Sequence, residues 1–261
     1  MQLFEFMIKS MRSIWMVVLV MVVFACKEDD PLPLPTLDFT NETAEVGRPV
    51  MFDNLTTNAD RYEWKFSDGQ TSESISPSIT FKKPGAVEVV LKAFTKDGQI
   101  DSLVRNITVK QRYLTAYAIN IYPLKDDGAD WDAGEAGDNI YPDIFLQLLV
   151  DKDNPSDDEF ENALFEGIFN NVKNTSFSRG VGDQGFPDNV ILTDESWGLA
   201  LFDFDGADIS NPKGSDFYFM AGVTFNPVQA PTFQVDYGGF ISIFFSDGIT
   251  TLDFYLYFVL K

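Results

Sequence analysis

The chain has 261 residues, of which 45% are hydrophobic and 15% aromatic, so it can bury the core of one or two globular domains. It contains no histidine and a single cysteine, which excludes serine–histidine and cysteine–histidine nucleophiles, histidine-ligated zinc and an intramolecular disulfide. A formal net charge of −21 argues against nucleic acid as a partner, because phosphate recognition needs a basic surface.

Residues 1–25 have the organisation of a secretory signal peptide. From Met11, a basic Arg12 precedes an apolar run from Ile14 to Ala25 that is too short to span a bilayer as a helix. The run ends in Val23-Phe24-Ala25-Cys26, which resembles the lipobox of bacterial lipoproteins. That resemblance implies cleavage before Cys26 and lipidation of this residue, which would anchor the protein to a membrane.

Residues 26–36 are expected to link this anchor to the first domain. Lys27-Glu28-Asp29-Asp30 resembles the lysine-plus-acidic export tag of surface lipoproteins in some Gram-negative bacteria. Pro31-Leu32-Pro33-Leu34-Pro35 favours a short, stiff polyproline spacer. The resemblances imply an outer-membrane protein exposed on the cell surface, although the sequence leaves a periplasmic orientation open.

Residues 37–110 have the pattern of a small all-β domain. Apolar residues alternate with polar ones, as at Val87 to Leu91, and Asp68-Gly69 and Asp97-Gly98 are hairpin turn signals. The stretch from Tyr62 to Gly69 resembles the W-x-F-G-D-G motif of the PKD (polycystic kidney disease) repeat family, and Phe81 to Val89 resembles its second landmark. The resemblance implies an immunoglobulin-like sandwich of about seven strands, with Trp64 in its core and a spacer or adhesion role.

Residues 113–261 predict a second, larger β-sandwich. The segment from Asp157 to Asn171 has helical spacing instead and predicts a helix. Ser246-Asp247-Gly248 predicts a hairpin between the last two strands, and the alternation of Asp253, Tyr255 and Tyr257 with Phe254, Leu256 and Phe258 gives the last strand two distinct faces. The predicted strands are Tyr113 to Tyr122, Ile144 to Val150, Leu199 to Phe204, Phe217 to Phe225, Phe240 to Phe245 and Leu252 to Leu260.

The acidic charge is concentrated in this second domain, which holds 25 acidic and six basic side chains. Two aspartate-rich stretches follow predicted strands, one after Tyr122 and one after Leu201-Phe202. Loops at one end of a sandwich can converge, and calcium takes six to eight oxygen ligands of the kind these loops supply. The candidate calcium ligands are Asp132, Asp143, Asp203, Asp205, Asp208 and Asp216.

The layout of these loops resembles the calcium-dependent lipid-binding β-sandwich domain of protein kinase C and the synaptotagmins. The residues that carry the resemblance are Asp132, Pro142-Asp143-Ile144-Phe145 and the Asp203-x-Asp205 pair, whereas Asn211 stands where that family has a further aspartate. The resemblance implies shared coordination of calcium. Solvated turns are the alternative, because aspartate, glycine and asparagine are common turn residues.

The sequence favours a non-enzymatic surface lipoprotein that binds an extracellular protein or glycan, with calcium in its acidic loops. One alternative is a glycan-capturing accessory protein, for which Trp131, Trp197, Tyr141 and Tyr237 are the candidate stacking residues. Another is a carbohydrate-active enzyme with paired carboxylates, but acidic groups in wet, glycine-rich loops lack the apolar surroundings that a general acid needs. We therefore expect no catalytic activity.

Overall fold

The computed structural model describes residues 33–121, 131–132, 141–150, 163–169, 177–183, 186, 188–206, 213–235, 238–246 and 251–261. The regular elements named in these ranges are strands, apart from the 3-10 helix η3 (Gly214–Asp216), which confirms the all-β class. The predicted signal peptide, the predicted lipidation site at Cys26 and the predicted export tag lie outside the described residues. Within the described ranges, no helical segment has the length and hydropathy needed to cross a bilayer.

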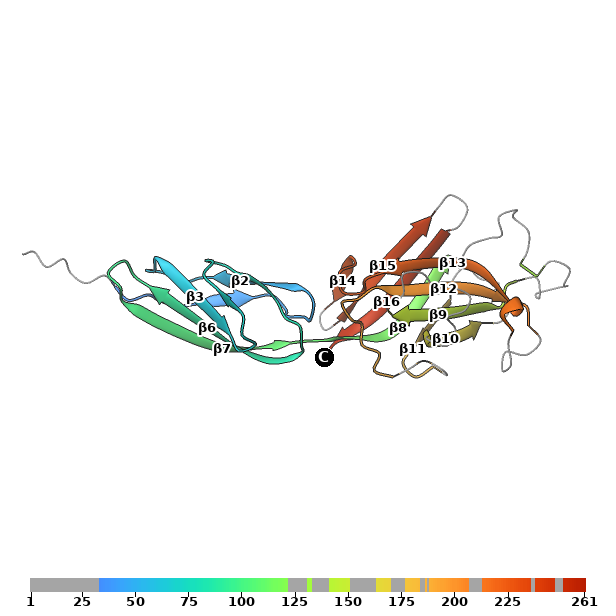
Figure 1. Ribbon diagram of the computed structural model, residues 1–261, viewed down its shortest axis with the longest axis horizontal. Coiled ribbons are helices and arrows are strands. Elements are labelled where there is room, and N and C mark those ends of the chain that lie inside the picture. The colour runs from blue at the N-terminus through green and yellow to red at the C-terminus, as the bar shows by residue number, and fades with distance from the viewer. Residues whose placement is uncertain are drawn as a thin grey trace, which may run out of the picture.

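The strands fall into two groups along the chain. The first group is β1 (Phe39–Asn41), β2 (Pro49–Asn54), β3 (Arg61–Phe66), β4 (Thr71–Ser72), β5 (Ser78–Thr80), β6 (Gly85–Phe94) and β7 (Ile100–Val109). The second group is β8 (Arg112–Ile121), β9 (Ile144–Val150), β10 (Ala163–Phe169), β11 (Phe177–Gly180), β12 (Trp197–Phe204), β13 (Phe217–Phe225), β14 (Thr232–Val235), β15 (Gly238–Ser246) and β16 (Thr251–Leu260). Each group forms a β-sandwich, and the two sandwiches lie end to end (Figure 1).

The N-terminal sandwich packs the sheet β1-β2-β5 against the sheet β4-β3-β6-β7. Alternate residues of β6 enter the core, as the period of an extended chain requires. Trp64 is fully buried and its indole nitrogen donates to the carbonyl of Ser74 at 3.0 Å, so it is the core anchor that the motif predicts. Gly69 and Gly98 have positive φ angles of 96° and 86° in the two expected turns.

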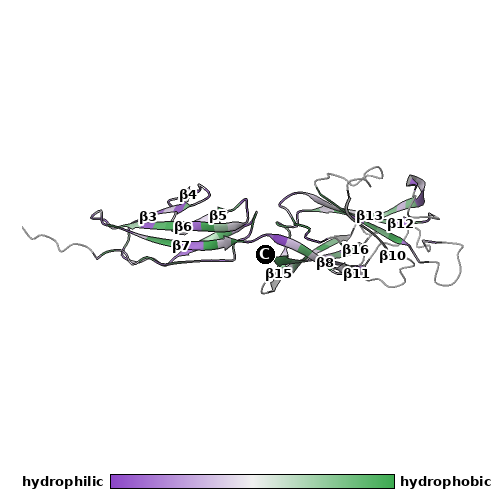
Figure 2. Cartoon of the chain, turned by 90° about the horizontal axis from the view of Figure 1, so that it is seen from below, coloured by the Kyte–Doolittle hydropathy of each residue, from purple (hydrophilic) through white to green (hydrophobic). Residues whose placement is uncertain are grey.

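The C-terminal sandwich is built from the sheets β10-β9-β12-β13 and β11-β8-β16-β15-β14. Figure 2 shows the two sheets as separate layers. The main core lies between them and includes Leu146, Leu199 and Leu256. The central strands β9 and β12 are buried on their outer face as well, where Phe145 and Phe202 belong to a smaller apolar cluster.

Six strands of the second sandwich were predicted close to their observed positions. The predictions for β9 and β13 match residue for residue, and the antiparallel pairing of β15 with β16 confirms the final hairpin. The helix predicted from Asp157 to Asn171 is wrong for residues 163–169, which form the edge strand β10. The backbone pairs with β9, and that tertiary partner outweighs a helical spacing in the sequence. Strands β11 and β14 were not predicted.

A short connection joins the sandwiches, because only Lys110 and Gln111 separate β7 from β8. Arg112 then turns its guanidinium into the junction, where it forms a buried bidentate ion pair with Glu45. The same guanidinium donates to the Pro227 carbonyl at 2.6 Å and to Thr232 Oγ1 at 3.2 Å. A side chain of the second sandwich thus holds a residue of the first.

Candidate metal centre

The C-terminal end of β12 positions two aspartates, Asp203 within the strand and Asp205 directly after it. Phe202 and Phe204 face the outer apolar cluster, so the alternation of the strand turns Asp203 toward the space between the sheets, on the same side as Leu201. Asp203 is fully buried, and its Oδ1 accepts the backbone N–H of Asp143 at 3.1 Å. Asp205 follows two residues later and is exposed.

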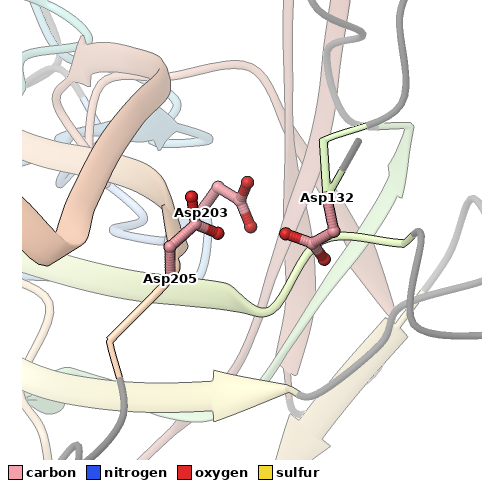
Figure 3. A group of neighbouring side chains, drawn as sticks. All are labelled: Asp132, Asp203 and Asp205. Atoms are coloured by element: carbon pink, nitrogen blue, oxygen red, sulfur yellow. The ribbon is translucent and has the colours of Figure 1, made fainter. Parts of the chain in front are cut away.

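The third carboxylate comes from a different part of the chain. Trp131 packs in the rim of the main core and leaves only 9% of its surface exposed, which fixes the position of the adjacent Asp132. Figure 3 shows the Asp132 carboxylate facing those of Asp203 and Asp205. One oxygen from each of the three residues lies within 4.8 Å of the others. We call Asp132, Asp203 and Asp205 the aspartate cluster.

The aspartate cluster brings three groups that can each carry a negative charge close together. Partial burial is the largest cause that raises the pKa of Asp132, from an ordinary 3.8 to about 7. A hydrogen bond with Asp205 and the negative charges of Asp203, Asp205 and Asp143 raise this pKa further. Below about pH 7, Asp132 therefore holds a proton, which removes its negative charge from the aspartate cluster.

The donor set of the aspartate cluster suits a hard divalent cation. Three carboxylates supply between three and six oxygens, and calcium accepts six to eight from carboxylates, carbonyls and water at 2.3–2.6 Å. The set contains neither nitrogen nor sulfur, and it therefore favours calcium or magnesium over zinc or copper.

The other predicted ligands have different positions. Asp143 is half-buried and adjoins the cluster through its backbone bond to Asp203, but its carboxylate is not one of the three that meet. Asp216 accepts the backbone N–H of Lys213 at 2.9 Å and so closes η3, while its own carbonyl accepts the N–H of Asp205 at 2.9 Å. Asp216 thereby positions Asp205. Asp208 lies outside the described residues.

The aromatic residues predicted to stack on a glycan are mostly unsuited to that role. Trp197 is fully buried with its indole nitrogen donating to Thr193 Oγ1 at 3.2 Å, and Trp131 is a core residue. Tyr141 is half-buried, and Tyr237 lies outside the described residues. Both tryptophans have large, mostly apolar side chains, and residues of this kind are usually buried in the core.

The sequence interpretation missed a set of aromatic side chains on the outer face of the five-stranded sheet. Tyr255 and Tyr257 stand on the polar side of the β16 alternation, and Phe233 and Phe240 lie beside them on β14 and β15. The alternation in β16 already indicated that Tyr255 and Tyr257 share one face of the strand. The residues beside them, Phe233 and Phe240, could not be identified without β14 and the register of the sheet.

Comparison with known proteins identifies the first sandwich. Residues 33–110 match the family model of the PKD domain, which confirms the domain predicted from the motif. The PKD1 domain of Vibrio anguillarum Epp is 23% identical over 30% of this chain and 96% of its own, with a TM-score of 0.28. The PKD1 domain of the Vibrio cholerae metalloprotease PrtV is 26% identical over 30% and 98%, with a TM-score of 0.27.

Another solved structure comes from work on the promiscuous specificity of carbohydrate-binding modules from the β-sandwich superfamily. It is 12% identical, covers 74% of this chain and 100% of its own, and has a TM-score of 0.29. A comparison with curated proteins gives no match.

Proposed function

We propose that this chain is a non-enzymatic binding protein of the cell surface, in which a calcium ion at Asp132, Asp203 and Asp205 stiffens one end of the binding domain. Its partner is an extracellular protein or glycan. The observation that carries the proposal is the meeting of three carboxylates, from two separate stretches of sequence, at one end of the C-terminal sandwich.

The energetics of the aspartate cluster favour a bound cation. Two carboxylates about 4 Å apart repel each other by roughly 4 kcal/mol at an effective dielectric constant near 20. A divalent ion would replace this repulsion by attraction and release the proton that the raised pKa of Asp132 keeps bound. The fully buried Asp203 would gain most, because an ionised carboxylate away from water needs a compensating charge.

The same geometry argues against a catalytic carboxylate pair. Glycosidases hold their two carboxylates on either side of the substrate bond, about 5 to 9.5 Å apart. Here Asp132 and Asp205 share a hydrogen bond, which leaves no room for a sugar between these two carboxyl groups. Joint coordination of an ion fits this spacing better than catalysis does.

The end-to-end arrangement of the two sandwiches agrees with a protein that is attached to a membrane at its N-terminal end. Pro33 lies beside Asn58, Asp60 and Thr95, at the opposite end of the ten-residue β7 from the junction with the second sandwich. A lipid at Cys26 would therefore attach the N-terminal sandwich to the membrane by its far end. The aspartate cluster follows β12, toward the end of the molecule remote from the PKD domain (Figure 1). The PKD domain would act as a spacer.

Thermal unfolding with and without calcium tests the metal site. We expect 1 mM calcium to raise the Tm of the soluble Cys26→Ala protein by several degrees over EGTA, because a ligand at 100 times its Kd stabilises by about 2.7 kcal/mol. Asp203→Asn and the exposed Asp205→Asn should lose this shift. Asp188→Asn changes an exposed aspartate outside the cluster and should keep it. An unchanged Tm in calcium would rule the metal site out.

The Cys26→Ala protein also tests the anchor. We expect it in the soluble fraction after cell lysis, whereas the wild-type protein should require detergent. A variant that remains membrane-bound would count against lipidation at Cys26 and would leave the calcium result unaffected.

A further inference from the structure

The outer face of the five-stranded sheet carries a row of touching aromatic rings. Phe233 on β14, Phe240 on β15 and Tyr257 on β16 are directly opposite one another in the register of the sheet. The rings of Phe233 and Phe240 are stacked with centroids 5.0 Å apart, and Phe240 lies 5.7 Å from Tyr257 and 5.9 Å from Tyr255. We call Phe233, Phe240, Tyr255 and Tyr257 the aromatic face.

The aromatic face is turned away from the core of the sandwich. Its neighbours along the strands, Ile241, Leu256 and Phe258, are the residues that fill the main core. Phe233 is 55% exposed and Tyr257 is 39% exposed. Large apolar side chains gathered on the surface mark interaction sites more often than isolated ones do.

Polar groups lie within the aromatic face. Tyr255 donates its hydroxyl to Asp253 at 3.0 Å, and Ser242 is directly opposite Tyr255 on β15. A hydrocarbon surface laid over these groups would remove water from a carboxylate and two hydroxyls without offering a hydrogen bond, which costs free energy. A partner rich in hydroxyl groups would satisfy them.

Charge restricts the partner further. The residues of β15 and β16 from Gly238 to Ser246 and from Thr251 to Leu260 include no lysine or arginine, and Asp253 makes this region acidic. An anionic ligand would be repelled. A second copy of the chain would also be repelled, because a symmetric contact would press two domains of strongly negative charge together at facing Asp253 residues.

We propose that the aromatic face binds a neutral polysaccharide. The apolar C–H faces of its sugar rings pack on Phe233, Phe240 and Tyr257, and its hydroxyl groups bond to Asp253, Ser242 and Tyr255. The row spans three strands, a width of ~10 Å at the usual strand spacing, which is comparable to the length of a disaccharide. This inference rests on the proposed binding function and is independent of calcium.

Affinity electrophoresis of the soluble Cys26→Ala protein tests the proposal. The gels contain, in turn, mixed-linkage β-glucan, xylan, galactomannan and dextran, with polygalacturonate as the charged control. We expect at least one neutral polysaccharide, but not polygalacturonate, to retard the protein. Phe240→Ala and Tyr257→Ala should each weaken this binding by about tenfold or more, since each removes a stacked ring. Tyr218→Ala removes a comparably exposed ring from the other sheet and should bind as the parent does.

Several results would overturn the proposal. The first is that none of the four neutral gels retards the protein. The second is that Phe240→Ala is retarded as strongly as the parent protein. A Phe240-dependent dimer in analytical ultracentrifugation, or Phe240-dependent binding to phosphatidylcholine vesicles, would assign the face to another partner. Running each gel in calcium and in EGTA separates the two proposals: retardation in both conditions supports the aromatic face even if the calcium site fails its own test.

Discussion

At the scale of single residues, Asp132 is the group whose chemistry depends most on its surroundings. In sequence it is one of several aspartates in an acidic stretch. In the fold it is half-buried next to the anchored Trp131, hydrogen-bonded to Asp205 and close to two more carboxylates. Its pKa is raised because burial and negative neighbours both favour the neutral form.

This raised pKa predicts how the metal-free protein responds to pH. Asp132 binds its proton more tightly in the folded state than in the unfolded chain, so its contribution to stability is complete below about pH 4. That contribution is lost as the pH rises through about 7. We therefore expect the Tm in EGTA to fall between pH 5 and pH 8 and to fall less in Asp132→Asn.

Calcium provides the matching control for this pH dependence. An ion in the cluster replaces the proton, so we expect calcium to flatten the pH profile of the wild-type protein between pH 5 and pH 8. Repulsion among the many acidic groups of the protein is nearly the same in the Asp188→Asn variant. The Tm of this variant should therefore change with pH as that of the wild type does. Identical slopes for wild type and Asp132→Asn would contradict the environment described for Asp132.

At the scale of elements, β16 shows how one strand serves two purposes. Leu256 is fully buried in the main core, and the next residue, Tyr257, belongs to the aromatic face. The strand lies between β8 and β15, so its backbone is paired on both sides. Because successive side chains point to opposite faces, one residue stabilises the sandwich and its neighbour is available to a ligand.

This alternation predicts contrasting effects of two neighbouring substitutions. Leu256→Ala should lower the free energy of unfolding by about 2–5 kcal/mol, because it leaves a cavity in the main core. Tyr257→Ala should lower it by about 1 kcal/mol or less, because it removes a surface contact with Phe240. Urea unfolding of both variants measures the difference. Similar losses at the two positions would place Tyr257 in the core and contradict the aromatic face.

Some strands could be predicted from the sequence pattern alone and others could not. Ile144 to Val150 and Phe217 to Phe225 were predicted with their observed bounds, because each is a compact run of strand-forming residues. Residues 163–169 were predicted as helix and form β10 instead. That segment is at the edge of its sheet, where pairing with β9 decides the conformation.

At the scale of the whole molecule, the buried pair of Arg112 and Glu45 ties the two sandwiches together. Burial lowers the pKa of the Arg112 guanidinium, and the hydrogen bond to Glu45 opposes this effect. Further contacts cross the junction: Gln229 donates to the Gly47 carbonyl at 2.9 Å, and Arg48 donates to Thr232 Oγ1 at 3.3 Å. The two sandwiches should therefore behave as one elongated body.

Removal of Glu45 should show the importance of this pair. We expect Glu45→Gln to destabilise the protein by about 3–5 kcal/mol, because it leaves the buried charge of Arg112 without a counter-charge. Urea unfolding measures the loss, and small-angle X-ray scattering should detect a broader range of inter-domain distances. Glu63→Gln breaks an exposed pair with Arg61 and should cost about 1 kcal/mol or less. Equal losses in the two variants would show that the junction is not held by the buried pair.

The sequence alone determined the all-β fold class, the PKD domain around Trp64 and the positions of six of the nine described strands of the second sandwich, because these features follow from local alternation, turn residues and a contiguous motif. It also named the aspartates of the cluster among six candidates, whereas calcium binding and lipidation of Cys26 remain predictions. The tertiary structure decided which carboxylates meet, that Trp131 and Trp197 belong to the core, and that Phe233, Phe240, Tyr255 and Tyr257 share an outer face. These features join residues far apart in the chain, and sheet order and register, which set such distances, depend on the packing of the whole sandwich.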